Sequence, residues 1–196
     1  MKTIKLSFGL KASVNNKTFY LTFLFLIIIS CAPSPSKLAE INPNALINNA
    51  DSLIAQRPDD IELRNAIVEA HLNLAKTDND PRHYISIIKF DPNNKRANYF
   101  IKIEEGKKYH KKGHKNGQWD AIQSFAKAAA LIDTLGAPYY WLGQAYEKKD
   151  EMDFELPLES YDKALSMYLE SDMRTRAESA RLALLDRKKT YEDFWK

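Results

Sequence analysis

The feature that most constrains this chain is a set of short signatures that recur at nearly one spacing. The segment 53–60 (Leu-Ile, three residues, Pro-Asp-Asp) returns 34 residues later at 87–94 (Ile-Ile, three residues, Pro-Asn-Asn). Glycine and tyrosine at 106 and 109 return at 143 and 146, an offset of 37, and an aromatic-x2-Ala pattern at 125–128 returns at 161–164, an offset of 36. Such a period is typical of stacked helix pairs, because no single pair can bury its apolar face alone.

The sequence between these signatures favours helices over strands. No sustained alternation of apolar and polar residues follows Asn42, whereas apolar residues from Leu63 to Leu74 recur on one helical stripe. Proline stands at a first helical position at 43, 81 and 138, and Asp60 and Asn94 are candidate N-caps. We expect helices at about 43–56, 61–76, 81–90, 95–112, 117–134, 138–149, 155–170 and 172–194.

Two of these segments carry a recognisable motif. Residues 139–146 read Tyr-x2-Leu-Gly-x2-Tyr, and 121–128 read Ala-x3-Phe-x2-Ala, with a closing proline at Pro58 and Pro92. Here the chain resembles the tetratricopeptide repeat family. The resemblance implies an all-α fold over 42–195, a short right-handed superhelix of antiparallel helix pairs in an α-solenoid of about three repeats plus a C-terminal capping helix. In the motif, Gly143 lets neighbouring helices approach closely, while Phe125 and Tyr161 fill the gaps.

Some segments depart from this pattern. The loop near 113–117 is about three residues longer than the motif requires, and the loop at 150–154 about two. Pro157 would break a helix interior, so we place it in the first turn of a helix that starts near Glu155. For the last helix we expect a solvated outer side carrying its arginines, with Phe194 and Trp195 pinning its end.

The first thirty residues read as a targeting segment. Four lysines precede an apolar run from Phe19 to Ile29, which covers only about half of a bilayer core. Ile28-Ile29-Ser30-Cys31 resembles the lipobox of bacterial lipoproteins, and the cysteine is the chain's only one. The resemblance implies that 1–30 is a lipoprotein signal peptide and that Cys31 carries the lipid (palmitate among its acyl chains).

An ordinary signal peptide with a chance cysteine, or an uncleaved anchor, is the alternative. In the lipoprotein interpretation, residues 31–41 are the lipidated cysteine and a polar spacer, because 32–36 read Ala-Pro-Ser-Pro-Ser. Ala32 follows the cysteine in place of the aspartate that retains lipoproteins at the inner membrane. We therefore expect a lipid-anchored protein of the cell outer membrane that faces the periplasm.

Charge excludes one class of partner. The net charge of +3 comes from the four lysines of the targeting segment, and the remainder has 25 basic against 26 acidic residues. That balance gives no support to a nucleic-acid interface.

No arrangement of residues typical of catalysis is present. We find no glycine-rich phosphate loop, no His-Glu-x2-His and no second cysteine for a zinc or redox pair. The sequence therefore predicts no catalytic residue, no metal site and no cofactor, and a protein that is not an enzyme.

The lysine-rich run at 107–115 leaves three interpretations open. His110 and His114 stand four apart and could face one metal ion, but the surrounding lysines would repel it. The run also suits a solvated helix end, whose dipole favours cations, or the binding of an acidic partner.

The family resemblance transfers a groove face from the first helix of each pair. His71 stands at a packed position and is expected in the core. The groove residues implied for protein or peptide binding are Asn65, Glu69, Asn73, Ile103, Lys107, His110, Lys111, Tyr140, Gln144 and Glu147. Lys107 and Lys111 suggest a carboxylate or an acidic segment as ligand.

Two functions follow as expectations. The first is a membrane-anchored scaffold for protein–protein interaction in the bacterial cell envelope. The second is an accessory subunit that binds a glycan or a solute in an envelope uptake or assembly system, since tryptophans and tyrosines offer stacking surfaces. Trp119 and Tyr139 coincide with packing positions of the motif, so we expect both in the core.

Overall fold

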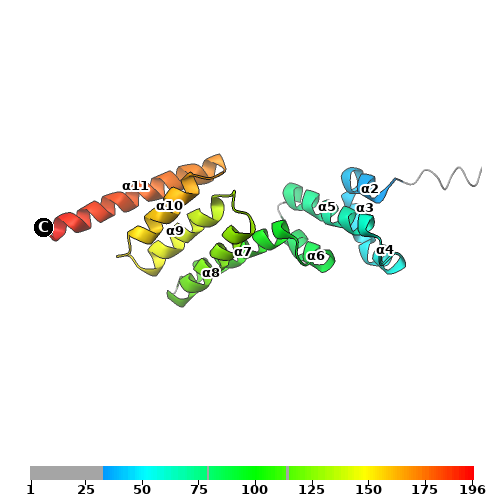
Figure 1. Cartoon of the computed structure of the whole chain (residues 1–196), viewed down its shortest axis with the longest axis horizontal. Coiled ribbons are helices and arrows are strands. Elements are labelled where there is room, and N and C mark those ends of the chain that lie inside the picture. The colour runs from blue at the N-terminus through cyan, green and yellow to red at the C-terminus, as the bar shows by residue number, and fades with distance from the viewer. Residues whose placement is uncertain (1–32, 79, 114) are drawn as a thin grey trace, which may run out of the picture.

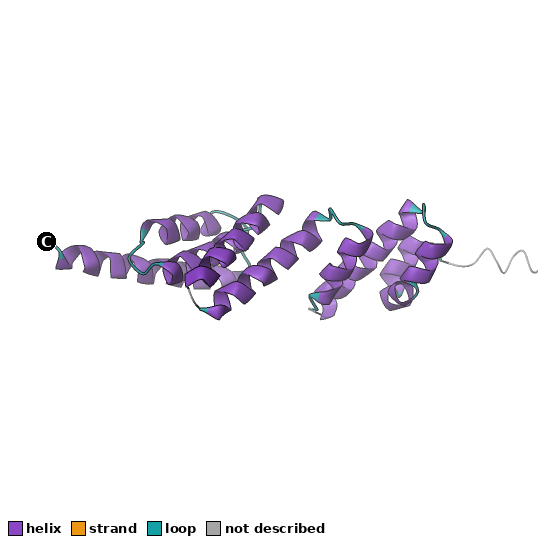
Figure 2. Cartoon of the chain, turned by 90° about the horizontal axis from the view of Figure 1, so that it is seen from below, coloured by secondary structure: helices purple, strands orange, loops and turns teal. Residues whose placement is uncertain are grey.

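The computed structural model describes residues 33–78, 80–113 and 115–196, without the side chain at 115. In this part of the chain the helices follow one another along an elongated stack, with α2 to α5 at one end and α11 at the other (Figure 1). Short loops join them, and the described residues form no strand (Figure 2). The predicted all-α class is confirmed. The targeting segment and Cys31 lie outside the described residues.

Most predicted helices are present within two residues of their expected ends. The described elements are α2 (Pro35–Ile41), α3 (Pro43–Asn48), α4 (Ala50–Gln56), α5 (Ile61–Asp78), α6 (Arg82–Phe90), α7 (Lys95–Lys112), α8 (Lys115–Leu131), α9 (Ala137–Lys149), α10 (Glu155–Leu165) and α11 (Ser171–Phe194). The predicted caps are confirmed, since Asp60 Oδ1 accepts from Leu63 N at 2.8 Å and Asn94 Oδ1 accepts from Ala97 N at 3.0 Å.

The N-terminal end differs from the expectation. Residues 31–41 were assigned to a spacer, but Pro35–Ile41 form α2, whose Ala39 is buried in a cluster with Leu63 and Ile67 of α5. The Ser34 hydroxyl accepts from Lys37 N and starts the helix, with proline at the first position. The single helix expected at 43–56 is also wrong, because Asn49 separates α3 from α4.

Two contacts between a glycine and an aromatic ring hold the clearest helix pairs together. In the pair α7–α8, a Cβ built on Gly106 would lie 2.4 Å from Phe125 Cε1. In the pair α9–α10, a Cβ built on Gly143 would lie 2.5 Å from Tyr161 Cε1. Both rings are fully buried. The recurring signatures therefore mark the same contact in successive units, as expected for Gly143, Phe125 and Tyr161.

The loops were predicted less well. Helix α8 begins at Lys115, two residues earlier than expected, so residues assigned to a long loop belong to the helix. Helix α10 ends at Leu165, not at 170. The following residues instead pair with the α8–α9 loop, because Gly136 N donates to Tyr168 O at 2.8 Å and Tyr168 N donates to Thr134 O at 3.3 Å. Pro157 lies in the first turn of α10, as predicted.

The contacts between helices are not equally extensive along the stack. Helix α5 contacts α2, α3, α4 and α6, but within the described chain it does not contact α7. Helix α6 alone joins the N-terminal helices to α7, through the stacked rings of Tyr84 and Phe100 at 4.3 Å. The groove expected to run through all three units is therefore interrupted between the first and the second.

Helix α11 packs one face on α9 and α10 and exposes the other. Ala177 and Leu184 are buried, whereas Phe194 and Trp195 are 78% and 70% exposed. The expectation that these two rings pin the helix end is wrong. The arginines are not all on the outer side either, because the Arg174 guanidinium donates to the carbonyls of Leu165 and Met167 and the Arg181 guanidinium bonds Asp162.

We predict that Gly106→Ala destabilises the fold by about 1–3 kcal/mol, because the added methyl group would overlap the buried Phe125 ring. Thermal unfolding followed by circular dichroism measures the loss. The double variant Gly106→Ala plus Phe125→Leu should recover part of it, since leucine leaves room for the methyl group. Equal melting temperatures for Gly106→Ala and the wild type would contradict the proposed packing.

Candidate binding groove

The first helices of the C-terminal pairs lie in one row with the last helix. Helix α7 contacts α9, and α9 contacts α11. Trp141 of α9 contacts α7 along this row: its ring lies 6.1 Å from that of His110, and the Lys107 ammonium lies 5.6 Å from its ring centroid. We call this surface of α7, α9 and α11 the inner face.

A pocket of about 450 Å³ opens at one end of the inner face. Five aromatic side chains line it, from α6, α7, α9 and the loop before α11: Tyr84, Tyr99, Phe100, Trp141 and Tyr168. The other lining residues are Pro81, Ile103, Glu104, Lys107, Leu135, Ala137, Leu169, Glu170 and Met173. The backbone bonds between the 134–136 and 168 segments hold Leu135 and Tyr168 together on its rim. We call this hollow the aromatic pocket.

The charges of the aromatic pocket are few and largely compensated. Lys107 Nζ lies 2.7 Å from Glu104 Oε1, on the preceding turn of α7. Burial, with the nearby Glu170 carboxylate, raises the pKa of Tyr99 to about 12, so this phenol stays neutral. The buried Trp141 Nε1–H has no hydrogen-bond partner among the described atoms. The pocket is therefore an apolar, aromatic hollow with a few charges near its rim.

A second hollow, of about 500 Å³, lies at the other end of the inner face. Its lining is polar: His110, Gln144, Glu147, Lys148, Glu151, Ala180, Ala183 and Arg187. Gln144 Nε2 donates to the Tyr161 hydroxyl at 2.6 Å, and that hydroxyl donates to Glu147 Oε1. Glu147 Oε2 also pairs with Arg187 of α11 at 3.3 Å. Burial and the Glu147 carboxylate raise the pKa of Tyr161 far above its usual value.

The structure places five of the predicted groove residues at the two hollows and the others elsewhere. Ile103 and Lys107 line the aromatic pocket, whereas His110, Gln144 and Glu147 line the second hollow. Lys111 is exposed one turn beyond Lys107. The prediction that Tyr140 lines the groove is wrong, because this side chain is 6% exposed and packs with Tyr161 and Leu184 beneath α11.

The three predicted residues of the first unit lie apart from the others. Asn65 and Glu69 are exposed on α5, and Asn73 is half-buried. Because α5 does not contact α7, these side chains are not brought together with the inner face. The position of α6 between the two groups explains the difference.

Sequence reasoning missed most of the aromatic pocket. Tyr99, Ile103 and Lys107 follow one another at intervals of four, so the helical spacing alone could have placed Tyr99 beside the two residues that were predicted. Tyr84, Tyr168 and Glu170 come from neighbouring elements and loops, and no local pattern marks them.

The lysine-rich run forms a basic edge together with the end of α9. We use "basic edge" for Lys108, Lys111, Lys112, Lys148 and Lys149. Lys148 Nζ reaches the carbonyl of His110 at 3.4 Å, and Lys149 Nζ lies 4.1 Å from the ring centroid of Trp119. Trp119 is 48% exposed, so the expectation of a core position for it is wrong.

His110 of α7 contacts the side chain of Gln118 on α8. Its Nδ1 lies 2.7 Å from Gln118 Oε1, and Gln118 Nε2 donates back to the His110 carbonyl at 3.2 Å. Gln118 is fully buried, and burial lowers the pKa of His110. His114 lies outside the described residues. Among the residues whose side chains are described, no three histidines, cysteines or carboxylates gather in a way that could hold a metal ion.

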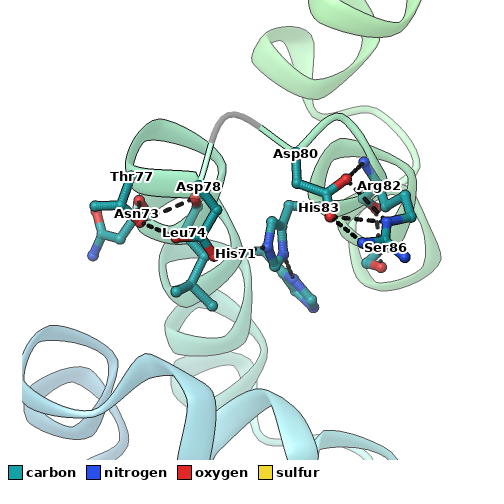
Figure 3. A network of polar contacts seen from close by, with 9 residues as sticks. All are labelled: His71, Asn73, Leu74, Thr77, Asp78, Asp80, Arg82, His83 and Ser86. Carbon is teal, nitrogen blue, oxygen red and sulfur yellow. Dashed lines mark hydrogen bonds and ion pairs between the residues drawn. The ribbon is translucent and has the colours of Figure 1, made fainter.

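A second histidine contact joins α5 to α6 (Figure 3). His71 Nδ1 lies 3.1 Å from His83 Nδ1, and His83 Nε2 lies 3.8 Å from Asp78 Oδ2. Asp80 accepts bonds from Arg82 in the turn between the helices, which lowers the pKa of its carboxyl to about 2. His71 is buried as expected, and burial with His83 and Lys89 nearby lowers its pKa to about 4.

Similarity to known proteins is found among solved structures and not among family models or curated proteins. No family model and no curated protein matches the chain. Among solved structures, the crystal structure of MamA is similar over 83% of this chain and 98% of that chain, at 15% identity and a TM-score of 0.38. The described helices themselves show an all-α stack of helix pairs, in which a glycine–aromatic contact recurs in two successive pairs.

No helix in the described part of the chain combines the length and the apolar character needed to cross a bilayer.

We predict that acidification weakens the contact between α5 and α6. Because the pKa of folded His71 is below its unfolded value of 6.5, its contribution to stability is complete above pH 6.5 and is lost as the pH falls towards 4. The loss is on the order of 2–3 kcal/mol. Urea unfolding at pH 7.5 and pH 5 measures it, with His71→Leu as the comparison. An equally steep pH dependence in His71→Leu would contradict this origin.

Proposed function

We propose that this protein is a tethered interaction module that holds a segment of a protein partner on its inner face. The observation that carries the proposal is the aromatic pocket, in which five rings from three helices and one loop surround an open hollow. Aromatic side chains in concave apolar sites are typical anchors of binding, because they release water from a large area at low entropic cost. The helical-repeat fold supports binding of a protein partner in general.

The polar groups of the inner face favour one kind of segment. Apolar side chains of the partner would occupy the aromatic pocket, where rings from four elements surround them. Acidic residues beyond that point would meet Lys107, Lys111 and the basic edge. Lys107 is already paired with Glu104, so we assign the attraction mainly to the lysines without a carboxylate partner in the described chain, among them Lys111 and Lys148.

We further propose that the module is a lipoprotein of the bacterial cell envelope, anchored through Cys31 in the outer membrane and facing the periplasm. The support comes from the sequence alone: the basic start, the short apolar run and the lipobox-like residues before the cysteine. Two or more acyl chains hold a protein stably on a membrane, whereas one does so only reversibly. Confinement to a surface raises the effective concentration of the module, so a modest affinity of the pocket suffices.

A variant at the rim of the aromatic pocket tests the binding proposal. Tyr168 is exposed there, and Tyr168→Glu would place a charge among apolar contacts. We predict that the partner recovered with tagged full-length chain from detergent-solubilised envelopes falls about tenfold, a loss of about 1.4 kcal/mol, since the new carboxylate would lose its water among the apolar contacts of the bound segment. Quantitative mass spectrometry of the eluates measures it.

The matched control is Met152→Glu, an exposed apolar residue outside the pocket, which should recover the partner as well as the wild type. The double variant Lys107→Glu plus Lys111→Glu tests whether the partner is acidic. Its control is Lys127→Glu plus Lys163→Glu, which makes the same change in charge elsewhere. Equal recovery by Tyr168→Glu and Met152→Glu would refute the pocket as the binding site.

The anchor has its own test. Metabolic labelling with a palmitate analogue should tag the wild type and spare Cys31→Ser, because the thiol is the only one in the chain. Equal labelling of both proteins would contradict the anchor while leaving the pocket proposal untouched.

One observation also favours a second function, an accessory subunit that binds a glycan or a solute. Rings that line a pocket stack on sugars as well as on side chains, and Trp141 would report such binding. No protein recovered in the experiment above, with a change in tryptophan fluorescence on addition of envelope glycans, would favour this alternative.

A further inference from the structure

The last helix of the described chain has an uncovered face. Helix α11 contacts only α9 and α10 within the described chain, through Ala177, Leu184 and their neighbours. On the opposite side Leu182 and Leu185 are 63% and 37% exposed. The helix lies at the outer edge of the stack (Figure 1). Two leucines on the open side of a 24-residue helix indicate a surface that packs against another helix.

The residues around these leucines form a continuous stripe. Glu178, Leu182, Leu185 and Lys189 follow at intervals of four, three and four, so they lie on one helix face. All four are exposed. Neither Glu178 nor Lys189 has an ion pair within the described chain, whereas α11 pairs several of its other charges internally. We call these four residues the outer stripe.

The outer stripe is complementary to itself in one orientation. When two α11 helices lie antiparallel along their outer stripes, with the two-fold axis at the level midway between residues 183 and 184, Leu182 faces the partner subunit's Leu185 and Glu178 faces the partner subunit's Lys189. Each contact then occurs twice, as a two-fold interface requires. A parallel pair would instead oppose each charge to its own copy, which is repulsive.

We propose that the outer stripe binds a second copy of this chain, with the two α11 helices antiparallel. The self-complementary order of charge and leucine selects this occupant over an unrelated helix. The proposal concerns the face of α11 turned away from the inner face and does not depend on the proposed function. A dimer would carry two aromatic pockets and would bind a partner with repeated segments more tightly than one copy.

An exchange of charges tests the proposal in the full-length chain purified in detergent. Analytical ultracentrifugation over a concentration series should show a reversible monomer–dimer equilibrium for the wild type. Glu178→Lys or Lys189→Glu alone places like charges at both contacts and should raise the dissociation constant about tenfold. An equimolar mixture of these two variants restores both opposite-charge contacts, so native mass spectrometry with one variant ¹⁵N-labelled should show the mixed dimer in excess over either homodimer.

Leucine variants complete the experiment. Leu182→Glu plus Leu185→Glu should abolish the dimer, and Leu156→Glu, at an exposed leucine of α10, should leave it unchanged. Circular dichroism should show the same melting temperature for the charge variants and the wild type. A wild-type chain that stays monomeric, a dimer that survives the double leucine variant, or a charge mixture without excess of the mixed dimer would each overturn the proposal.

Discussion

The close approach of helices at Gly106 and Gly143 is the constraint on which the C-terminal half of the structure depends. At both positions a ring from the second helix of the pair occupies the space of the missing side chain. The ring can be buried there only if the two helix axes come close, and that closeness fixes how the two helices of each pair pack on one another. Helices α7 and α9 lie side by side, and α11 continues the row. The inner face is the surface that these three helices share.

The N-terminal helices obey a different arrangement. Helix α5 has no glycine opposite a large ring, and it packs against the short helices α2 and α3. Within the described chain, α6 connects these helices to α7. Tyr84 of α6 stacks on Phe100 of α7, and both rings line the aromatic pocket. The contact between α6 and α7 therefore forms part of the pocket wall.

The helices were largely predictable because the sequence signals that start, end and pair them lie within a few residues. Spacing, proline positions and N-caps such as Asp60 and Asn94 act within a few residues, so the helices and their pairing could be read from the sequence. The inner face was predictable only in part. Ile103 and Lys107 follow from the motif, but the burial of Tyr140 depends on how α11 lies across α9, and the place of Tyr168 depends on two loops that pair far apart in sequence. Contacts of this kind carry no local signature, and neither did the helix at Pro35–Ile41, whose buried Ala39 needs α5 beside it.

Helix α11 shows how one element can serve two surfaces. Its packed face completes the core with Ala177 and Leu184, and its N-terminal turns place Glu170 and Met173 at the aromatic pocket. A helix that only closed a stack would carry polar residues on its remaining side, because solvent faces it there. The leucines of the outer stripe do not follow that rule, and the unpaired charges that flank them are arranged with two-fold order. Since the pocket and the outer stripe lie on different sides of the same rigid helix, a ligand in the first does not obstruct a partner on the second. Binding and self-association are thus separable properties of this chain, and variants on α11 can change either one alone.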